Sequence, residues 1–460
     1  MDDMRVKTYD GLPMPRRVFA VATVSLGVVL AVLDVTIMNI ALPTMSDTMH
    51  LTEADTIWIV NGYQLAIIMC LLAMSTIGEI FSYRKVYMFG LSLFTLASVA
   101  CACAQNLGML VASRMLQGVG ASAMMAINMT LLRLSYPKKW LGKGIGLNAT
   151  LVAIASVLGP SLSALILSTL SWRWLFLINL PLGLFALFMG YRALPHNVVR
   201  LTERPLPKKD ILLNATFFGS LILVVQGFSH GFNTHIIVAI AALCLGVGVY
   251  YVKRQLGMQY PLLPVDLMRI PLFSLSVLTS IASFTAQMLA MVSIPFFFEK
   301  GYGFSESATG LLFSAWPVSI MVAAPLAGSL IGKVNAGIMG GIGLAFLSFG
   351  IGALSLLPNN PSYADIVWRL LCCGFGFGLF QSPNNNVLIT SAPLNRSGSA
   401  SGMLAMARLI GQTTGATLVA LLFHLFSADV APRYALYAGS AVAFMACVVS
   451  LCRLTLKKDK

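Results

Sequence analysis

Charged side chains are scarce in this sequence, where Asp, Glu, Lys and Arg together make up 10% of 460 residues. Soluble domains normally carry about 25% charged and about 45–50% apolar residues. Here 58% of the residues are hydrophobic, and the mean hydropathy is +0.84. Because so few charges cannot cover a folded chain with polar surface, the composition excludes an ordinary soluble globular protein.

Several chemical motifs are also missing. No glycine-rich phosphate loop ending in Gly-Lys-Ser/Thr occurs, which argues against ATP-driven chemistry by this chain alone. The histidines lack metal-ligand spacing, and no nucleophile–base pattern is present, so we expect neither a metal site nor an enzyme. The eight cysteines lie within or at the edges of hydrophobic runs, where cysteine is usually a small packing residue.

Long hydrophobic runs dominate the chain instead. A helix needs about 20 apolar residues to cross a hydrocarbon core of roughly 30 Å. The fold class predicted is all-α integral membrane with 14 transmembrane helices, of which the pair within 211–252 is the weakest. The predicted spans are 18–42, 54–78, 86–104, 108–132, 145–169, 174–194, 211–229, 236–252, 272–298, 307–331, 335–357, 363–389, 398–426 and 433–452.

The net charge of +14 indicates how the chain is oriented in the membrane. With the N-terminus inside, most of the 30 Lys and Arg fall in inward-facing segments, as in cytoplasmic loops of membrane proteins. A nucleic-acid patch would gather those charges on one folded face, so no nucleic-acid partner is expected. We therefore predict a multi-pass protein of the bacterial cytoplasmic (inner) membrane with both termini cytoplasmic.

The spans group into two blocks of six helices around a two-helix insert. Helix number alone also allows a channel or an unrelated carrier. The predicted segments are a cytoplasmic tail (1–17), an N-terminal bundle (18–195), a linker (196–210), the insert (211–252), a second linker (253–271), a C-terminal bundle (272–452) and a cytoplasmic tail (453–460).

Eight short motifs follow one another along the chain. They are LDVTIMNIALP at 33–43, WIVNGY at 58–63, RMLQGVGA at 114–121, Gly159-Pro160, WRWLFLINLPLG at 172–183, GFGFG at 374–378, SPNNN at 382–386 and RSGSASG at 396–402. Together they closely resemble the fourteen-helix drug:proton antiporters (the DHA2 family) of the major facilitator superfamily. The resemblance implies a major facilitator fold, two six-helix bundles plus two inserted helices.

The segment that follows the second span departs from that family. At 75–85 the sequence reads STIGEIFSYRK instead of a pattern like GxLADRxGRR, with Glu79 in place of the acid and Arg84-Lys85 at the basic end. The Gly159-Pro160 motif is followed by Ser163-Ala164 rather than two glycines. The resemblance assigns gating or structural roles to Glu79, Arg84, Lys85, Gly159 and Pro160, and an ordinary transmembrane proline is the alternative for Pro160.

Of the 16 acidic residues, only Asp34 lies well inside a predicted span. A charge at the bilayer centre costs at least about 2.5–3.5 kcal/mol, and such residues normally mark ion paths or proton relays. Burial raises the pKa of a carboxyl group and a nearby cation lowers it, so a buried acid can exchange its proton when its surroundings change. By elimination, Asp34 is predicted to couple transport to protons.

Its partner follows from helix geometry. Asp34 lies roughly 24 Å along its helix from Val18, and Arg114 lies roughly 9 Å inward from Gly108 at the opposite membrane face. Across a hydrocarbon core of about 30 Å, the two residues therefore lie at nearly the same depth. Arg114 is expected to face Asp34 and control its protonation. The alternative is a structural tie from Arg114 to helix-end carbonyls.

Further polar residues are candidates for a substrate cavity, or equally for bonds between helices. Gln381, Asn384 and Asn385 share one helix face by their spacing. Glu299 is either a second acidic site or a solvated loop end, and Arg408 inside the cavity would argue against cationic substrates. The other candidates are Trp58, Asn61, Tyr63, Gln64 and Gln117.

The predicted function is proton-coupled efflux of small amphipathic compounds by alternating access, as a multidrug or biocide antiporter. Alternatives are an exporter of a specific metabolite, lipid or siderophore on the same scaffold, or a membrane receptor without transport. No cofactor is expected because the proton gradient supplies the energy. The expected partners are the lipid bilayer, protons and a small-molecule substrate; the chain is expected to be monomeric, and any envelope adaptor would be a separate chain.

Overall fold

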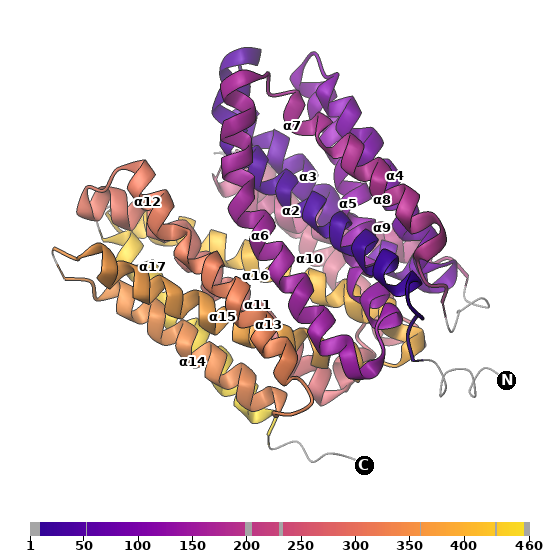
Figure 1. Ribbon diagram of the computed structural model, residues 1–460. Coiled ribbons are helices and arrows are strands. Elements are labelled where there is room, and N and C mark those ends of the chain that lie inside the picture. Colours follow the sequence, from indigo (N-terminus) through magenta and orange to yellow (C-terminus); the bar gives the residue numbers. More distant parts are fainter. Residues whose placement is uncertain are drawn as a thin grey trace. The chain divides into compact units, whose positions relative to one another are not determined.

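The computed structural model describes residues 10–51, 53–197, 205–229, 233–358, 360–427 and 430–454. Apart from one isolated bridge between Ile331 and Val334, the regular structure of these residues is helical. Helices suit a lipid-embedded chain because they satisfy their backbone hydrogen bonds internally. The predicted all-α class is confirmed (Figure 1).

The helices of the N-terminal part are long, and three of them, α2, α3 and α5, extend beyond the predicted spans at both ends. Asn106 caps α5 by accepting a hydrogen bond from the Met109 backbone N–H at 2.9 Å. The bounds are α2 (Arg16–Met49), α3 (Glu53–Ile80), α4 (Tyr83–Ala102), α5 (Leu107–Ser135), α6 (Leu141–Thr169), α7 (Trp174–Leu177) and α8 (Asn179–Ala193).

Two helices follow that form an antiparallel pair, α9 (Lys208–Ser229) and α10 (Thr234–Leu256). The remaining helices are α11 (Pro271–Tyr302), α12 (Glu306–Phe313), α13 (Ala315–Leu330), α14 (Ala336–Ser355), α15 (Tyr363–Ser391), α16 (Ser397–Leu425) and α17 (Ala431–Cys452). The predicted span 307–331 is thus divided between α12 and α13.

By length and apolar composition, 13 helical segments among the described residues can cross a membrane. They correspond to 13 of the 14 predicted spans. The remaining prediction, 211–229, falls on α9, which is helical over 22 residues but is not one of those segments. The count of 14 therefore stays a prediction.

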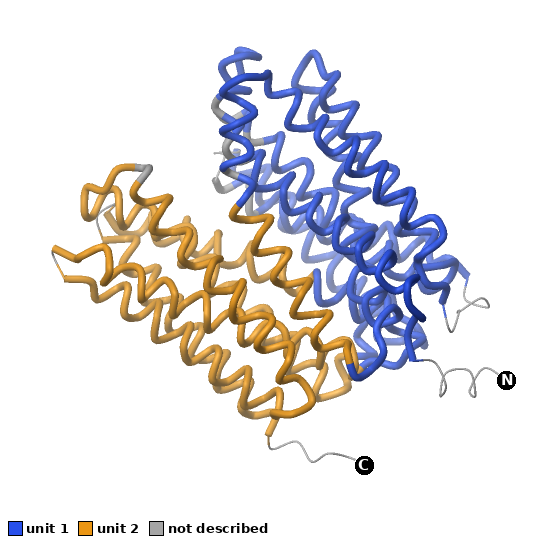
Figure 2. The backbone as a smooth tube through the Cα atoms, in the orientation of Figure 1, with its two compact units in different colours: residues 1–139, 158–267, 392–405 blue, residues 140–157, 268–391, 406–460 orange. Residues whose placement is uncertain are grey.

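The chain divides into two compact units (Figure 2). Unit 1 contains residues 1–139, 158–267 and 392–405, and unit 2 contains residues 140–157, 268–391 and 406–460. Both α6 and α16 contribute residues to each unit. The predicted boundaries of bundles, linkers and tails stay predictions, and much of the tails and residues 198–204 of the first linker lie outside the described residues.

Small residues allow α5 to pack closely against its neighbours in unit 1. A Cβ atom on Gly118 would lie 2.5 Å from the Tyr63 carbonyl oxygen of α3, and one on Gly120 would lie 2.6 Å from the Phe94 nitrogen of α4. Such close approach is typical of membrane helix packing. It brings the residues just before Gly118, including Arg114 and Gln117, against α3 and α4.

Candidate functional site

The buried acid of α2 lies in a polar cluster inside unit 1. Asp34 is 3% exposed, and Arg114 and Gln117 of α5 are fully buried. The Arg114 Nη1 donates to Asp34 Oδ2 at 2.6 Å. The structure therefore brings together Asp34 and Arg114, the two residues predicted to couple transport to protons.

Amide side chains complete this cluster. The Gln117 Nε2 donates to Asp34 Oδ1 at 2.8 Å and to Ser98 Oγ of α4 at 2.9 Å. The Asn179 Nδ2 of α8 donates to the same Asp34 oxygen at 3.4 Å and to Ser98 Oγ at 3.2 Å. Side chains of α5 and α8 thus bind the Asp34 carboxylate of α2, and Ser98 of α4 accepts hydrogen bonds from both amides.

The Arg114 guanidinium has further partners. Its Nε donates to the Ile59 carbonyl oxygen at 3.2 Å, and its Nη1 also donates to Gln117 Oε1 at 2.6 Å. The guanidinium carbon lies 4.3 Å from the ring centroid of Tyr63 and 5.7 Å from that of Phe176. Cation–π contacts strengthen when they are desolvated, so these rings and acceptors compensate the buried cation.

The hydrogen bonds around Asp34 have a chemical consequence. Every hydrogen bond recorded to its two oxygens comes from an N–H donor: Arg114, Gln117 and Asn179. A protonated carboxyl group has an O–H that needs an acceptor of its own. The recorded donors therefore match an ionised carboxylate, and an O–H at this position would need an acceptor in place of one of them.

A second ion-pair cluster of unit 1 lies where α3 ends. Glu79 in the last turn of α3 is 1% exposed, and its Oε2 accepts a hydrogen bond from Arg396 Nη1 at 3.0 Å. Arg396 also binds both oxygens of Asp266, at 3.0 and 2.9 Å. The Glu79 Oε1 accepts from the Ser399 backbone N–H at 2.6 Å. Glu79 therefore holds residues 396–399 against α3 of the same unit.

The basic end of the same motif is placed differently. Arg84 is partly exposed. Its Nη1 lies 3.2 Å from the His196 Nε2, and its guanidinium carbon lies 5.9 Å from the centroid of the Tyr191 ring. Lys85 is exposed. Neither residue joins the recorded hydrogen bonds of Glu79, so of the predicted gating residues in this segment only Glu79 is buried in an ion-pair cluster.

Gly159 of α6 contacts α2 directly. A Cβ atom at this position would overlap Thr36 Oγ1 and lie 2.7 Å from Thr36 Cβ. Thr36 is two residues from Asp34, so Gly159 brings α6 close to the buried acid. The side chain of Pro160 lies outside the described residues.

The remaining α3 candidates differ in exposure. Tyr63 and Asn61 are buried, Trp58 is partly buried, and Gln64 is exposed. Tyr63 contacts the Asp34 cluster through its ring, which lies 4.3 Å from the Arg114 guanidinium carbon.

In unit 2, Asn384 makes bonds between helices. It is 1% exposed and donates to Ser280 Oγ of α11 at 2.7 Å, while its Oδ1 accepts from Arg453 Nη2 at 2.6 Å. Burial lowers the pKa of Arg453, which lies just beyond α17, to about 10. This geometry favours the interhelical alternative for Asn384.

The other unit 2 candidates do not form one recorded cluster. Asn385 is buried, and Gln381 and Glu299 are partly buried. Arg408 is partly buried, with its guanidinium 6.0 Å from the Phe284 ring centroid. Among the described residues, no group of three or more His, Cys, Asp or Glu could hold a metal ion.

Sequence reasoning missed four members of these clusters: Ser98, Asn179, Asp266 and Arg396. Asn179 and Arg396 lie within the quoted motifs 172–183 and 396–402. The motifs therefore pointed to these segments, but they did not show which residues Asn179 and Arg396 contact. Ser98 and Asp266 carry no sequence signal, because a serine in a hydrophobic run and an acid in a loop are both common.

The Major Facilitator Superfamily model matches residues 24–416 and, in an overlapping match, 276–460. The chain is 48% identical over 451 residues to an uncharacterized transporter of Escherichia coli, YebQ, covering 98% of each chain. It is 27% identical to the riboflavin transporter RibZ of Clostridioides difficile, covering 89% of each. It is 28% identical to the multidrug resistance protein Stp of Mycobacterium tuberculosis, covering 89% of this chain and 76% of that one. With a helical fold and many apolar helices of membrane-spanning length, the chain belongs to the Major Facilitator Superfamily of membrane transporters.

Proposed function

We propose that this transporter exports small amphipathic compounds in exchange for protons, with Asp34 as the proton-carrying group. The observation that carries the proposal is the buried Asp34 carboxylate, held by Arg114, Gln117 and Asn179. A membrane-buried acid paired with a cation is typical of proton relays in transporters. The similarity to a multidrug resistance protein supports the substrate class.

The cluster suggests how protonation changes the protein's state. When Asp34 is ionised, Arg114 and the two amides tie α2 to α5 and α8. When the carboxyl group binds a proton, the charge attraction to Arg114 is lost and the O–H needs a new acceptor. We propose that this rearrangement accompanies alternating access. In this cycle, proton uptake from outside and proton release to the cytoplasm alternate with substrate export.

The energetics suit this exchange. One proton crossing about 100 mV supplies about 2.3 kcal/mol, and each tenfold concentration ratio costs about 1.4 kcal/mol. One proton therefore sustains an outward substrate gradient of roughly fifty-fold before any pH gradient is added. No cofactor is needed for this step.

We also propose the finer arrangement in the membrane. The α9 helix has 22 residues, about 33 Å at 1.5 Å per residue, which is long enough to cross a core of about 30 Å. With α9 as the fourteenth span, the chain has the helix number of the DHA2 branch. Its excess of basic loops then places both termini in the cytoplasm of a bacterial cell, and we expect the transporter to act as a monomer.

Glu79 and Arg396 supply a second element of the proposal. On this topology the end of α3 and the start of α16 face the cytoplasm. Their buried ion pair, reinforced by Asp266 and the Ser399 N–H, acts as a latch that opens and closes as the transporter cycles. Glu79 thus keeps the role that the family pattern gives its acid, although the surrounding motif differs.

A narrower substrate range is the second candidate. The similarity to a riboflavin transporter, which is about as strong as that to the multidrug resistance protein, favours export of a specific metabolite. The same proton chemistry at Asp34 would serve this substrate.

The test uses purified full-length protein in proteoliposomes that contain a pH-sensitive dye. A panel of toxic dyes, biocides, antibiotics and flavins is added on the side from which export starts. Proton movement with several unrelated compounds supports multidrug exchange, and movement with flavins alone supports the second candidate. Substrate transport without any proton signal would contradict both.

A further inference from the structure

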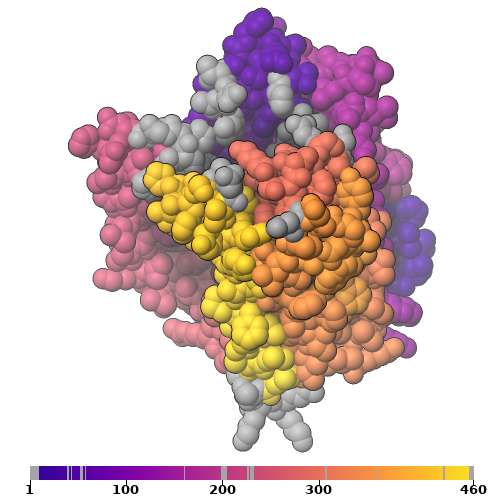
Figure 3. Space-filling view, turned by 90° about the vertical axis from the view of Figure 1, so that its left-hand side faces the viewer, coloured from indigo at the N-terminus to yellow at the C-terminus, as the bar shows by residue number. Residues whose placement is uncertain are grey.

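One end of the α9–α10 pair carries charged residues that belong neither to the Asp34 cluster nor to the Glu79–Arg396 ion pair. The α9 helix packs on α3 within unit 1, where the Asn214 Nδ2 donates to the Met69 carbonyl oxygen at 2.9 Å. Tyr251 of α10 donates to Asn214 Oδ1 at 3.2 Å. The rest of α10 is largely exposed, and part of the pair is visible as the pink surface in Figure 3.

Exposed apolar side chains cover the outer face of α10. Leu245 is 70% exposed and Leu256 54% exposed. Others are Ile236, Val238, Leu243, Val249 and Val252. In a membrane transporter such a face contacts acyl chains, and on the proposed topology the last turn of α10 reaches the cytoplasmic headgroups.

A buried carboxylate fixes one cation at this end. Asp210, at the start of α9, has a side chain 2% exposed and accepts hydrogen bonds from Arg254 Nε at 2.8 Å and Nη2 at 3.4 Å. The Gln255 Nε2 donates to the same carboxylate at 2.8 Å, and its Oε1 accepts from the Leu262 N–H at 2.6 Å. Asp210 therefore fixes the orientation of the Arg254 side chain, which stays 34% exposed.

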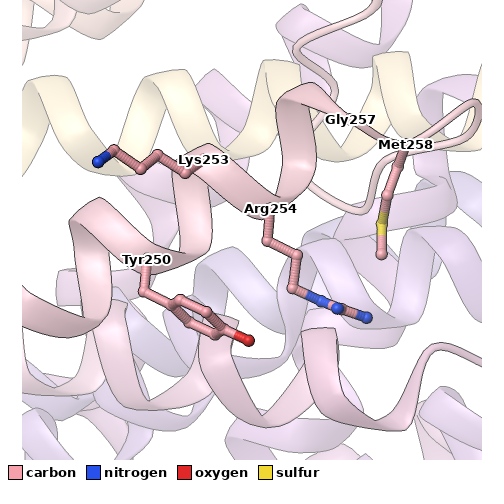
Figure 4. Close-up of a pocket in the computed structure, with 5 residues that line it drawn as sticks. All are labelled: Tyr250, Lys253, Arg254, Gly257 and Met258. Atoms are coloured by element: carbon pink, nitrogen blue, oxygen red, sulfur yellow. The ribbon is translucent and has the colours of Figure 1, made fainter.

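A shallow groove of about 620 Å³ opens beside Arg254. It is lined by Tyr250, Lys253, Arg254, Gly257 and Met258. In Figure 4 the Tyr250 hydroxyl and the Arg254 guanidinium extend in the same direction from α10, and the Lys253 ammonium extends to the other side. Hydroxyl and guanidinium N–H groups on one side suit an acceptor with several oxygens, such as a phosphate.

The charge around the groove is positive. Lys208 and Lys209 at the start of α9 are exposed, as is Lys253. Of these, Lys253 lines the groove together with Arg254, and the carboxylate bonded to Arg254, Asp210, is buried. A basic site at the cytoplasmic side of membrane helices recruits anionic lipid headgroups.

We propose that this groove binds the phosphate of an anionic phospholipid, with Arg254 and Tyr250 as donors, Lys253 as a second cation and the acyl chains along α10. Free phosphate offers the same oxygens, but the adjoining apolar face of α10 gives a lipid additional contacts. The site does not depend on which substrate is exported.

The test is native mass spectrometry of the full-length protein, titrated with dioleoyl phosphatidylglycerol. Matched titrations use dioleoyl phosphatidylcholine, and competition uses inorganic phosphate. The variants are Lys253→Gln and Tyr250→Phe, which leave the Asp210–Arg254 pair intact. The control is Lys333→Gln, which removes an exposed lysine beside α13.

We expect phosphatidylglycerol to bind in preference to phosphatidylcholine and each variant to weaken the tightest phosphatidylglycerol site about fivefold. The control should bind as the unaltered protein does. Equal affinity for both lipids would overturn the proposal, as would an unchanged affinity of all variants for phosphatidylglycerol. Displacement of the lipid by millimolar phosphate would show a free-anion site and overturn the lipid assignment.

Discussion

The Asp34 carboxylate on α2 accepts a hydrogen bond from the Arg114 guanidinium on α5 at 2.6 Å, with both side chains almost fully buried. Gln117, one helical turn from Arg114, bonds to both members of the pair. A charge pair this deeply buried depends on both partners, because removing one leaves the other charge uncompensated.

Replacing Asp34 by Asn should abolish proton-linked transport. The amide keeps the size and some hydrogen bonds of the carboxyl group but cannot carry a titrating proton. Dye-loaded proteoliposomes should show no pH change when substrate is added, while the protein still folds. Asp47→Asn, an exposed change on the same helix, is the matched control and should keep the signal. Normal proton exchange by Asp34→Asn would exclude Asp34 as the coupling acid.

Replacing Arg114 by Met should lower the free energy of unfolding by about 3–5 kcal/mol, because it leaves the buried Asp34 charge without its cation. Combining Arg114→Met with Asp34→Asn should recover part of that loss, since no ionised group then remains. Thermal unfolding of the purified variants in detergent measures both effects. If the two losses simply add, the two residues do not stabilise each other.

Replacing Glu79 by Gln should loosen residues 396–399. The variant loses the ion pair to Arg396 and weakens the bond from the Ser399 N–H. Hydrogen–deuterium exchange of peptides covering 392–405 should rise about tenfold. Asp365→Asn breaks a more exposed pair with Arg369 and should leave that region unchanged. Unaltered exchange in Glu79→Gln would argue against a latch.

Replacing Gly159 by Ala should destabilise the protein by about 1–3 kcal/mol, the usual cost of overpacking, because the added methyl overlaps Thr36. The exposed Gly246 of α10 has nothing within 4 Å of an added Cβ. Gly246→Ala should therefore be neutral or stabilise its helix by about 0.5–1 kcal/mol. Equal effects of the two changes on thermal unfolding would mean that α6 can move away from α2 without cost.

Some contacts were predictable because they involve rare residues in regular elements. A single acid inside a hydrophobic run is conspicuous, and helical rise places Asp34 and Arg114 at the same depth. Glu79 lies one residue beyond the predicted span 54–78, but it is 1% exposed. Its partner Arg396 lies 317 positions away in sequence, a distance over which local patterning carries no information.

Hydropathy, charge distribution and motif order by themselves determined that this chain is a helical membrane protein of the transporter type, and that Asp34 is the acid farthest inside a hydrophobic run. These properties follow from transfer free energies, which sum residue by residue along the chain. The tertiary structure decided which amides hold Asp34, that Asn384 links helices, and that Arg254 faces an open groove. Those outcomes depend on how helix faces pack against one another, and side chains distant in sequence meet only after packing is complete.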